Sequence, residues 1–122
     1  MIGIDIVSIC RIEKNLQKYG EDFLKKFLSS EEINLLRTSS GFKSSSVAGF
    51  WAAKEACSKA LGVGISDELR FFDIHLSKTP KNAPIIKLEP SKNNAFQIKS
   101  IDLSISHDGG FAIAAVIVNK IQ

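Results

Sequence analysis

Hydrophobic residues alternate with other residues near both ends of the chain. In residues 2–7 the three isoleucines fall on one side of an extended segment, and Gly3, Asp5 and Val7 fall on the other. Near the other end, DLSISH alternates and FAIAAVIV is continuously apolar, with DGG between them. The sequence therefore predicts a short first strand with Asp5 on its less apolar side, and a C-terminal hairpin of two strands.

Helical spacing is typical of the first half of the chain. Apolar residues recur at helical intervals over 9–19, and Gly20 predicts the end of that helix. A second short helix is predicted over 23–28, and SSEEINLLR predicts a third, with Ser29 and Glu32 in capping-box register. After a polar loop over 38–46, a long helix is predicted over roughly 46–61, ended by Gly62.

The remaining segments complete the predicted fold. Residues 69–76 and 85–89 predict two strands around a Pro-rich turn, and a short helix is expected near 91–98. Strands and helices interleave without repeated βαβ units. We predict an α+β fold in which a mostly antiparallel sheet packs with a long central helix and shorter helices.

Length and composition add limits to this picture. The 122 residues contain no dividing linker, so a single domain over 1–122 is predicted. No apolar run approaches the roughly 20 residues of a membrane span, and residues 1–5 do not resemble a secretory signal, so a cytoplasmic protein without membrane contact is expected. Cys10 and Cys57 lie in apolar patterns without metal-ligand spacing, which predicts buried reduced thiols. The formal charge of +3 does not by itself indicate nucleic-acid binding.

Three positions could carry chemistry, although each also has a simple structural explanation. Glu55 and Lys59 are four residues apart in the long helix, and a surface ion pair worth about 0.2–0.5 kcal/mol would explain them. Asp5 is less ordinary, because aspartate is depleted in strands. Together, Asp5 and Glu55 provide the two carboxylates that Mg²⁺ needs when phosphate oxygens and water complete its coordination. Lys59 would then stabilise charge on a leaving phosphate.

Further candidate phosphate ligands lie elsewhere in the sequence. His107 ends a predicted strand, where a solvated turn residue is the alternative, and Ser104 and Ser106 share one face of that strand. Lys43 precedes the N-terminus of the long helix, a position that favours anions. These residue types predict the transfer of a phosphorus-linked group, without indicating which group.

Three segments resemble a known family. GIDIV…RI at 3–12, FWAAKEACSKALGVGI at 50–65 and LSISH at 103–107 match, in order and spacing, the holo-acyl-carrier-protein synthases, which are the small bacterial phosphopantetheinyl transferases. The resemblance covers essentially the whole chain. It implies the 4'-phosphopantetheinyl transferase fold and transfer of phosphopantetheine from coenzyme A to a serine of apo acyl carrier protein. Adenosine 3',5'-bisphosphate is the other product, and fatty acid biosynthesis is the pathway implied.

The resemblance also implies roles for individual residues. Asp5 and Glu55 would hold Mg²⁺ against the coenzyme A pyrophosphate, and Lys59 would stabilise and protonate the departing phosphate. His107 would contact the phosphates, with Ser104 and Ser106 nearby. Either a carboxylate or a metal-bound water would take the proton of the acceptor serine.

Two kinds of partner surface are implied as well. Family members of this size are usually homotrimers with sites at subunit interfaces, where the histidine strand of one chain would meet the Asp5/Glu55 pair of its neighbour. The apolar strand 111–118 would then have either an intersubunit or an ordinary core role. The basic residues Arg11, Lys14 and Lys18 lie at i, i+3 and i+7 on the first helix, where the family docks its acidic carrier protein.

The chain departs from the family pattern at three places. Val7 and Ser8 stand where many members carry an acid, so water is expected to replace a third metal ligand. Phe50 stands where arginine is common, which leaves Lys43 or another lysine to contact coenzyme A. NAP at 82–84 replaces the usual GKP turn.

Other functions fit parts of the same pattern. A non-catalytic basic domain that binds an acidic protein or a nucleotide would explain the charge, but it would not need Asp5, Glu55, Lys59 and His107 together. A transferase of the same family with another carrier as substrate is a closer alternative. A nucleic-acid binder is a weaker one, because the basic stripe lacks interleaved aromatic residues.

Overall fold

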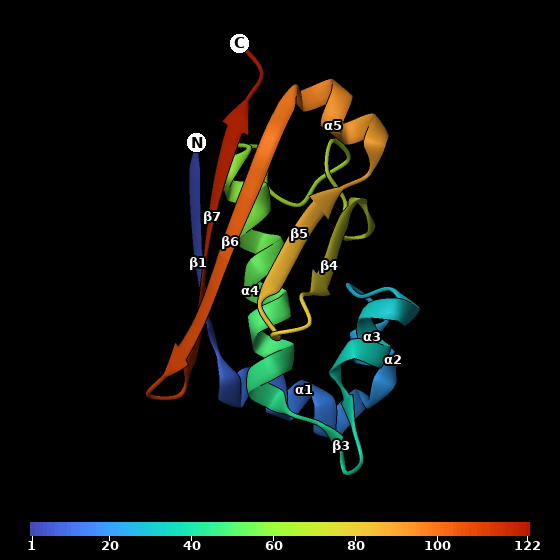
Figure 1. Cartoon of the computed structure of the whole chain (residues 1–122). Coiled ribbons are helices and arrows are strands. Elements are labelled where there is room, and N and C mark those ends of the chain that lie inside the picture. Colours follow the sequence, from blue (N-terminus) through green and yellow to red (C-terminus); the bar gives the residue numbers. More distant parts are fainter.

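Three antiparallel strands form the main sheet. In the computed structural model, which describes residues 1–122, β1 (Ile2–Ser8), β7 (Phe111–Lys120) and β6 (Ile98–Asp108) lie in the order β1-β7-β6 (Figure 1). Because β7 is central, β1 is hydrogen-bonded to a neighbouring strand on one side only. The first strand and the C-terminal hairpin predicted from the sequence are confirmed, and β6 extends beyond the predicted segment at both ends.

The long helix α4 (Ser44–Ala60) lies against one face of this sheet, to the right of β1 and β7 and partly behind β6 in the view of Figure 1. It begins two residues before the predicted start and ends next to Gly62, whose φ of 75° favours glycine. Most of its residues are buried, and many of these are alanines. Small side chains allow the helix to lie close to the strands.

Three shorter helices lie around one end of α4 (lower part of Figure 1). They are α1 (Ile9–Tyr19), α2 (Glu21–Leu24) and α3 (Ser30–Leu36). The predicted capping box opens α3, since Ser29 Oγ accepts the Glu32 N–H at 3.2 Å and Glu32 Oε1 accepts the Ser29 N–H at 2.8 Å. The second helix is shorter than predicted and ends at Leu24.

Two small hairpins complete the fold. β2 (Arg37–Thr38) pairs with β3 (Gly41–Phe42) in the segment predicted as a loop, and β4 (Ile74–Lys78) pairs with β5 (Pro84–Leu88). The short helix α5 (Pro90–Phe96) follows β5. All strand pairs are antiparallel, so the predicted α+β class is confirmed.

The prediction of a strand over 69–76 was wrong for the first half of that segment. Phe71–Asp73 instead form a 3₁₀ turn, η1, and β4 begins at Ile74. The Asp73 carboxylate accepts the backbone N–H of Arg70 at 2.8 Å, and this local bond stabilises the turn in place of an extended ladder.

The isoleucine side of β1 faces away from α4. Ile2, Ile4 and Ile6 are 57–68% exposed, whereas Gly3 and Val7 are buried against the helix. On β7 the alternate residues Phe111, Ile113 and Ile117 are exposed as well, and their register with β1 places them on the same outer face. The strand predicted as continuously apolar therefore has one face in the core and one apolar face exposed.

The two cysteines differ in environment. Cys57 is buried in α4, and burial raises the pKa of its thiol to about 12. Cys10 is exposed, so the prediction of a buried thiol was wrong there. The side of α1 that meets the core carries Ile12 instead.

A buried ion pair joins α4 to the helical end of the molecule. Lys54 is fully buried, and its ammonium group donates to Glu32 Oε1 at 2.8 Å and to the carbonyl oxygens of Phe27 and Phe71 at 2.8 and 3.0 Å. Glu32 Oε2 accepts the Leu76 N–H at 2.8 Å. Every polar atom of the pair is thus hydrogen-bonded, as buried charges require.

None of the helices is long and apolar enough to span a bilayer.

Candidate active site

Three of the predicted site residues meet between the open edge of β1 and α4. The Lys59 ammonium lies 2.8 Å from Asp5 Oδ1 and 3.3 Å from the carbonyl oxygen of Ile4. Glu55 lies one turn before Lys59 on α4, so its carboxylate shares a helix face with that ammonium. The sheet and the helix therefore bring together two carboxylates and one ammonium, as the sequence pattern predicts.

The charges in this group affect one another. Burial raises the pKa of Glu55, the nearby Asp5 carboxylate raises it further, and Lys59 opposes the shift. The hydrogen bond to Asp5 raises the pKa of Lys59 above its ordinary value. Glu55 is only half-buried and Lys59 is exposed, so a ligand from solvent can reach both groups.

The donor set at this position suits a hard cation. Two carboxylates from different elements are what Mg²⁺ uses when it keeps several waters and takes phosphate oxygens from a substrate. No third His, Cys, Asp or Glu joins them to form a larger cluster. Ser8, where an acid is common in the family, has its hydroxyl oxygen occupied as the N-cap of α1, accepting the Arg11 N–H at 3.3 Å.

His107 lies in a different place within the chain. It lines a hollow of about 190 Å³ whose other walls come from the N-terminal half of α4, from β6, from β4, from the turn after β4 and from the start of β5. The lining residues are Ser45, Ser46, Gly49, Phe50, Lys78, Asn82, Pro84, Ile105 and His107. None of Asp5, Glu55 and Lys59 is among them, so one chain alone does not unite the four residues.

Ser104 and Ser106 face the other side of the sheet from His107. They pair with Ala115 and Ile113, whose side lies with the exposed isoleucines, whereas His107 pairs with Ala112 on the α4 side. Within one chain, the two hydroxyls and the imidazole therefore cannot bind the same group.

Lys43 and Lys78 lie near the N-terminus of α4. Lys43 is the residue that precedes the helix, and it is exposed in an extended conformation. Lys78 lines the His107 hollow, with its ammonium 5.8 Å from the centre of the Phe50 ring. Lys78 was not predicted from the sequence, because its position in this hollow depends on how β4 lies against α4.

Trp51 belongs to an aromatic cluster one turn before Glu55. Its ring packs edge-on against Phe27 at 4.9 Å and lies 5.4 Å from Phe71 and 6.4 Å from Phe23. This aromatic packing holds α4 against α2 and η1 close to the position of Glu55.

The basic side chains predicted for partner binding are all exposed on α1. Arg11, Lys14 and Lys18 follow one side of the helix, and the opposite side carries Ile12 to the core. Lys18 and Lys26 both lie over the exposed ring of Tyr19, at 5.2 and 5.1 Å from its centre. The basic surface formed by Arg11, Lys14 and Lys18 therefore continues past the end of α1 to Lys26.

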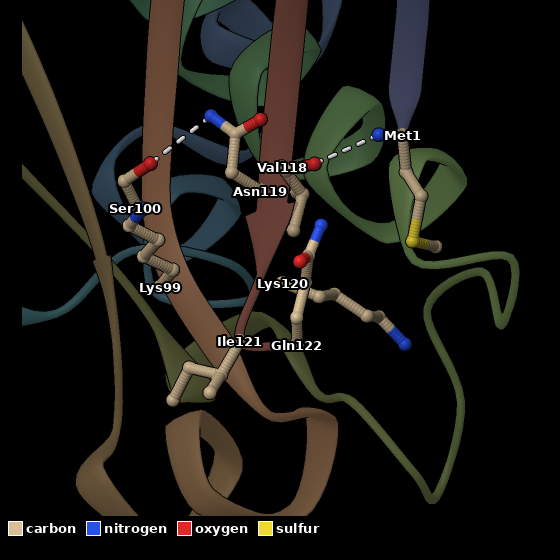
Figure 2. A pocket seen from close by; sticks show the side chains of 8 residues that line it. All are labelled: Met1, Lys99, Ser100, Val118, Asn119, Lys120, Ile121 and Gln122. Atoms are coloured by element: carbon tan, nitrogen blue, oxygen red, sulfur yellow. Dashed lines mark hydrogen bonds between the residues drawn. The ribbon is translucent and has the colours of Figure 1, made fainter.

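A separate hollow of about 850 Å³ lies at the end of the sheet where the two termini meet (Figure 2). Its walls include Lys99, Lys120 and the chain ends, and the Met1 ammonium donates to the Val118 carbonyl oxygen at 2.7 Å. No acidic or imidazole side chain lines it, so it offers none of the chemistry found at Asp5 and Glu55.

The sequence matches a known family along almost its whole length. The family model of the 4'-phosphopantetheinyl transferase superfamily matches residues 1–116. The chain belongs to this superfamily. It is 59% identical over 120 residues to the holo-[acyl-carrier-protein] synthase of Helicobacter pylori (strain ATCC 700392 / 26695), covering 98% of each protein. It is 56% identical over 119 residues to that of Campylobacter curvus (strain 525.92), covering 98% of this chain and 100% of the relative.

Solved structures of this superfamily share the fold. The crystal structure of Helicobacter pylori holo-[acyl-carrier-protein] synthase in complex with coenzyme A has a TM-score of 0.91 and 59% identity, covering 98% of this chain and 100% of the other. The Bacillus anthracis synthase in complex with CoA (3',5'-ADP) has a TM-score of 0.80 and 37% identity, over 98% and 96% of the two chains. The family, fold and enzyme class predicted from the sequence are confirmed: this is a phosphopantetheinyl transferase.

Proposed function

We propose that this transferase moves the 4'-phosphopantetheine group of coenzyme A to a serine of apo acyl carrier protein. Adenosine 3',5'-bisphosphate leaves, and the holo carrier serves fatty acid biosynthesis in the cytoplasm. The observation that carries the proposal is the meeting of Asp5, Glu55 and Lys59 at the edge of β1 in a chain 59% identical to a holo-[acyl-carrier-protein] synthase. Transfer of a phosphorus-linked group needs mainly positioning and charge neutralisation, and this trio supplies both.

Each residue of the trio has a distinct part. Asp5 and Glu55 would hold Mg²⁺, which when bound neutralises charge on the coenzyme A pyrophosphate. Lys59, kept protonated by Asp5, stabilises the charge that develops on the departing phosphate and can donate a proton to it. The partly open position of Glu55 and Lys59 leaves room for the acceptor serine to approach.

We infer that the complete site forms between subunits of a homotrimer. Two observations support this: His107 lies in a hollow without the trio, and the outer face of β1 and β7 exposes six large apolar side chains. They are Ile2, Ile4, Ile6, Phe111, Ile113 and Ile117. An apolar face of this kind marks an interface with another chain. The His107 hollow of one subunit, with Lys43 and Lys78, would bind coenzyme A phosphates beside the trio of its neighbour.

In this assembly, Ser104 and Ser106 occupy a different position from His107. They lie on the outer face that the trimer would cover, so they would reach coenzyme A only at a subunit interface. We assign the acidic carrier protein to the basic side of α1, with Arg11, Lys14 and Lys18 in contact with it.

Intact-protein mass spectrometry tests the reaction. Apo acyl carrier protein is incubated with this protein, coenzyme A and Mg²⁺, beside one sample with EDTA and one with Glu55→Gln. A gain of one phosphopantetheine only in the complete sample supports the transfer, its metal dependence and the role of Glu55. No gain with any of several apo carriers would reject the function. A gain that survives Glu55→Gln would reject this account of the site.

Subunit mixing tests the shared site. Glu55→Gln and His107→Ala are each expected to be inactive as pure proteins. If the two residues act across an interface, mixed trimers contain a site with both native residues, and activity returns after the variants are unfolded and refolded together. If one chain holds the whole site, the mixture stays inactive.

A further inference from the structure

Gly3 lies directly against the backbone of α4. A Cβ atom placed on Gly3 would lie 2.0 Å from the carbonyl oxygen of Ala56 and 2.5 Å from the backbone nitrogen of Ala60. Both distances are far below van der Waals contact, and both atoms belong to the main chain, so no side-chain rotation can relieve the overlap. Any larger residue at position 3 must move β1 away from the helix.

This contact lies beside the candidate active site. Gly3 and Asp5 share one face of β1, two residues or about 6.6 Å apart along the strand. On the helix, Ala56 directly follows Glu55 and Ala60 directly follows Lys59. This tight contact of strand with helix therefore occurs next to the point where Asp5 meets Glu55 and Lys59.

We propose that Gly3 is a positioning residue, whose close contact with Ala56 and Ala60 sets the distance between Asp5 and the Glu55–Lys59 turn. β1 is an edge strand held by hydrogen bonds on one side only, so overlap with the α4 backbone would displace β1 more readily than the central strand β7. An outward shift would lengthen the 2.8 Å bond between Asp5 and Lys59 and separate the two carboxylates. The inference deepens the proposed function, because the spacing of the carboxylates determines how well they hold a divalent cation.

The variant Gly3→Ala adds the single atom that overlaps. Ala56→Ser enlarges a buried side chain on the residue whose backbone makes this contact, and it serves as a second variant if Gly3→Ala does not fold. The matched control is Val116→Ala, since Val116 is the β7 partner of Gly3, buried against α4, and its truncation weakens the core without pushing β1 outward. Thermal unfolding of each variant establishes that it is folded and how far its stability has changed.

Two measurements on the folded variants report the spacing. The first is Mn²⁺ binding followed by electron paramagnetic resonance, with Glu55→Gln as the reference for loss of the site. We expect Gly3→Ala to weaken binding by about 10- to 100-fold and Val116→Ala to leave it unchanged. The second is competitive labelling of lysine amines with trace acetic anhydride, quantified at Lys59 relative to Lys14. The Lys59 amine should react several-fold faster once its bond to Asp5 lengthens.

The outcomes separate this inference from the proposed function. If neither Mn²⁺ affinity nor Lys59 labelling changes in folded Gly3→Ala, or if both change equally in Val116→Ala, the positioning role is wrong. If wild type and Glu55→Gln bind Mn²⁺ equally weakly, the metal role of the carboxylates is wrong, and Lys59 labelling still decides the role of Gly3. If labelling rises in folded Gly3→Ala at Lys59 and not at Lys14, the inference is supported.

Discussion

The ammonium of Lys59 donates a hydrogen bond of 2.8 Å to Asp5, a residue 54 positions away in the sequence. The bond joins the last turn of α4 to the edge strand β1, and it fixes the ammonium beside two carboxylates. It also keeps Lys59 protonated, because the Asp5 partner raises the pKa of the amine. The same contact therefore holds the site together and keeps its cation charged.

Replacing Lys59 with glutamine should abolish most activity while leaving the fold intact. The Lys59 side chain is 52% exposed and that of Asp5 only 13%, but glutamine can still donate a hydrogen bond to Asp5, so the free energy of unfolding should fall by only about 1 kcal/mol. The rate of phosphopantetheine transfer should fall by about 100- to 1,000-fold, because charge on the leaving phosphate loses its stabilising group. Urea unfolding and a single-turnover transfer assay provide the two values. A variant that loses stability in proportion to its activity would contradict the catalytic role.

Replacing Glu55 with glutamine should stabilise the protein at neutral pH in the absence of metal. Burial, and then the Asp5 carboxylate, raise the pKa of Glu55, so the folded state holds the Glu55 proton to a higher pH than the unfolded chain. The folded state therefore loses stability as pH rises from the ordinary glutamate pKa to the raised value, and glutamine avoids this loss. The stability difference should be small near the ordinary glutamate pKa, at about pH 4, and should grow as pH rises above it, as measured by urea unfolding in EDTA. A Glu55→Gln variant that is less stable than wild type at the higher pH would contradict this.

Removing the buried charge of Lys54 should destabilise the protein strongly. Lys54→Met leaves Glu32 buried without its cation, which costs about 3–5 kcal/mol. The double variant Lys54→Met/Glu32→Gln removes both charges and should recover part of that loss. Guanidinium unfolding of the single and double variants measures the coupling. Equal destabilisation in the single and double variants would mean that the pair acts only through packing.

A charge on the outer face of the sheet should dissociate the proposed trimer. Ile117 is 45% exposed in one chain, so Ile117→Lys would be nearly neutral for a monomer but would bury a lysine at an interface. Native mass spectrometry should show trimers for wild type and monomers for the variant. Leu35→Lys is the matched control, because Leu35 is 44% exposed but lies on α3. Trimers that persist in Ile117→Lys would exclude this face as the interface.

Reversing the charge of Arg11 should weaken carrier recognition. Arg11→Glu is expected to raise the KM for apo acyl carrier protein by about tenfold at low salt, equivalent to about 1.4 kcal/mol, with little change in the KM for coenzyme A. The effect should shrink as salt is added. Lys120→Glu, an exposed charge reversal on β7, provides the control. If both charge reversals raise the KM for the carrier equally, the net charge of the protein, and not a docking surface on α1, determines carrier recognition.

Much of the local structure could be predicted from residue types alone. Gly20 and Gly62 mark helix ends, and the capping box of Ser29 and Glu32 opens α3, because these signals act over a few residues. The 3₁₀ turn at Phe71 was missed, since apolar spacing indicated a strand and one side-chain bond from Asp73 decided otherwise.

The candidate site was predictable in its residue types but not in its arrangement. The resemblance pointed to Asp5, Glu55, Lys59 and His107 by position along the chain. It also implied that His107 and the Asp5–Glu55 pair come from different chains, but it did not indicate that Lys78 lies beside His107, because that depends on how β4 and β6 pack around α4. Nor did it indicate the buried pair of Lys54 and Glu32, since both residues look like surface charges in a helical pattern.

The sequence by itself determined the family, the α+β class, the ends of most helices and the residues that could hold a metal and a phosphate. These follow from short-range signals and from a residue pattern with defined spacing. Only the tertiary structure decided that the glycine side of β1, rather than its isoleucine side, meets α4. The reason is steric: the helix backbone approaches so closely at Gly3 that no side chain fits, and the isoleucines must face outward.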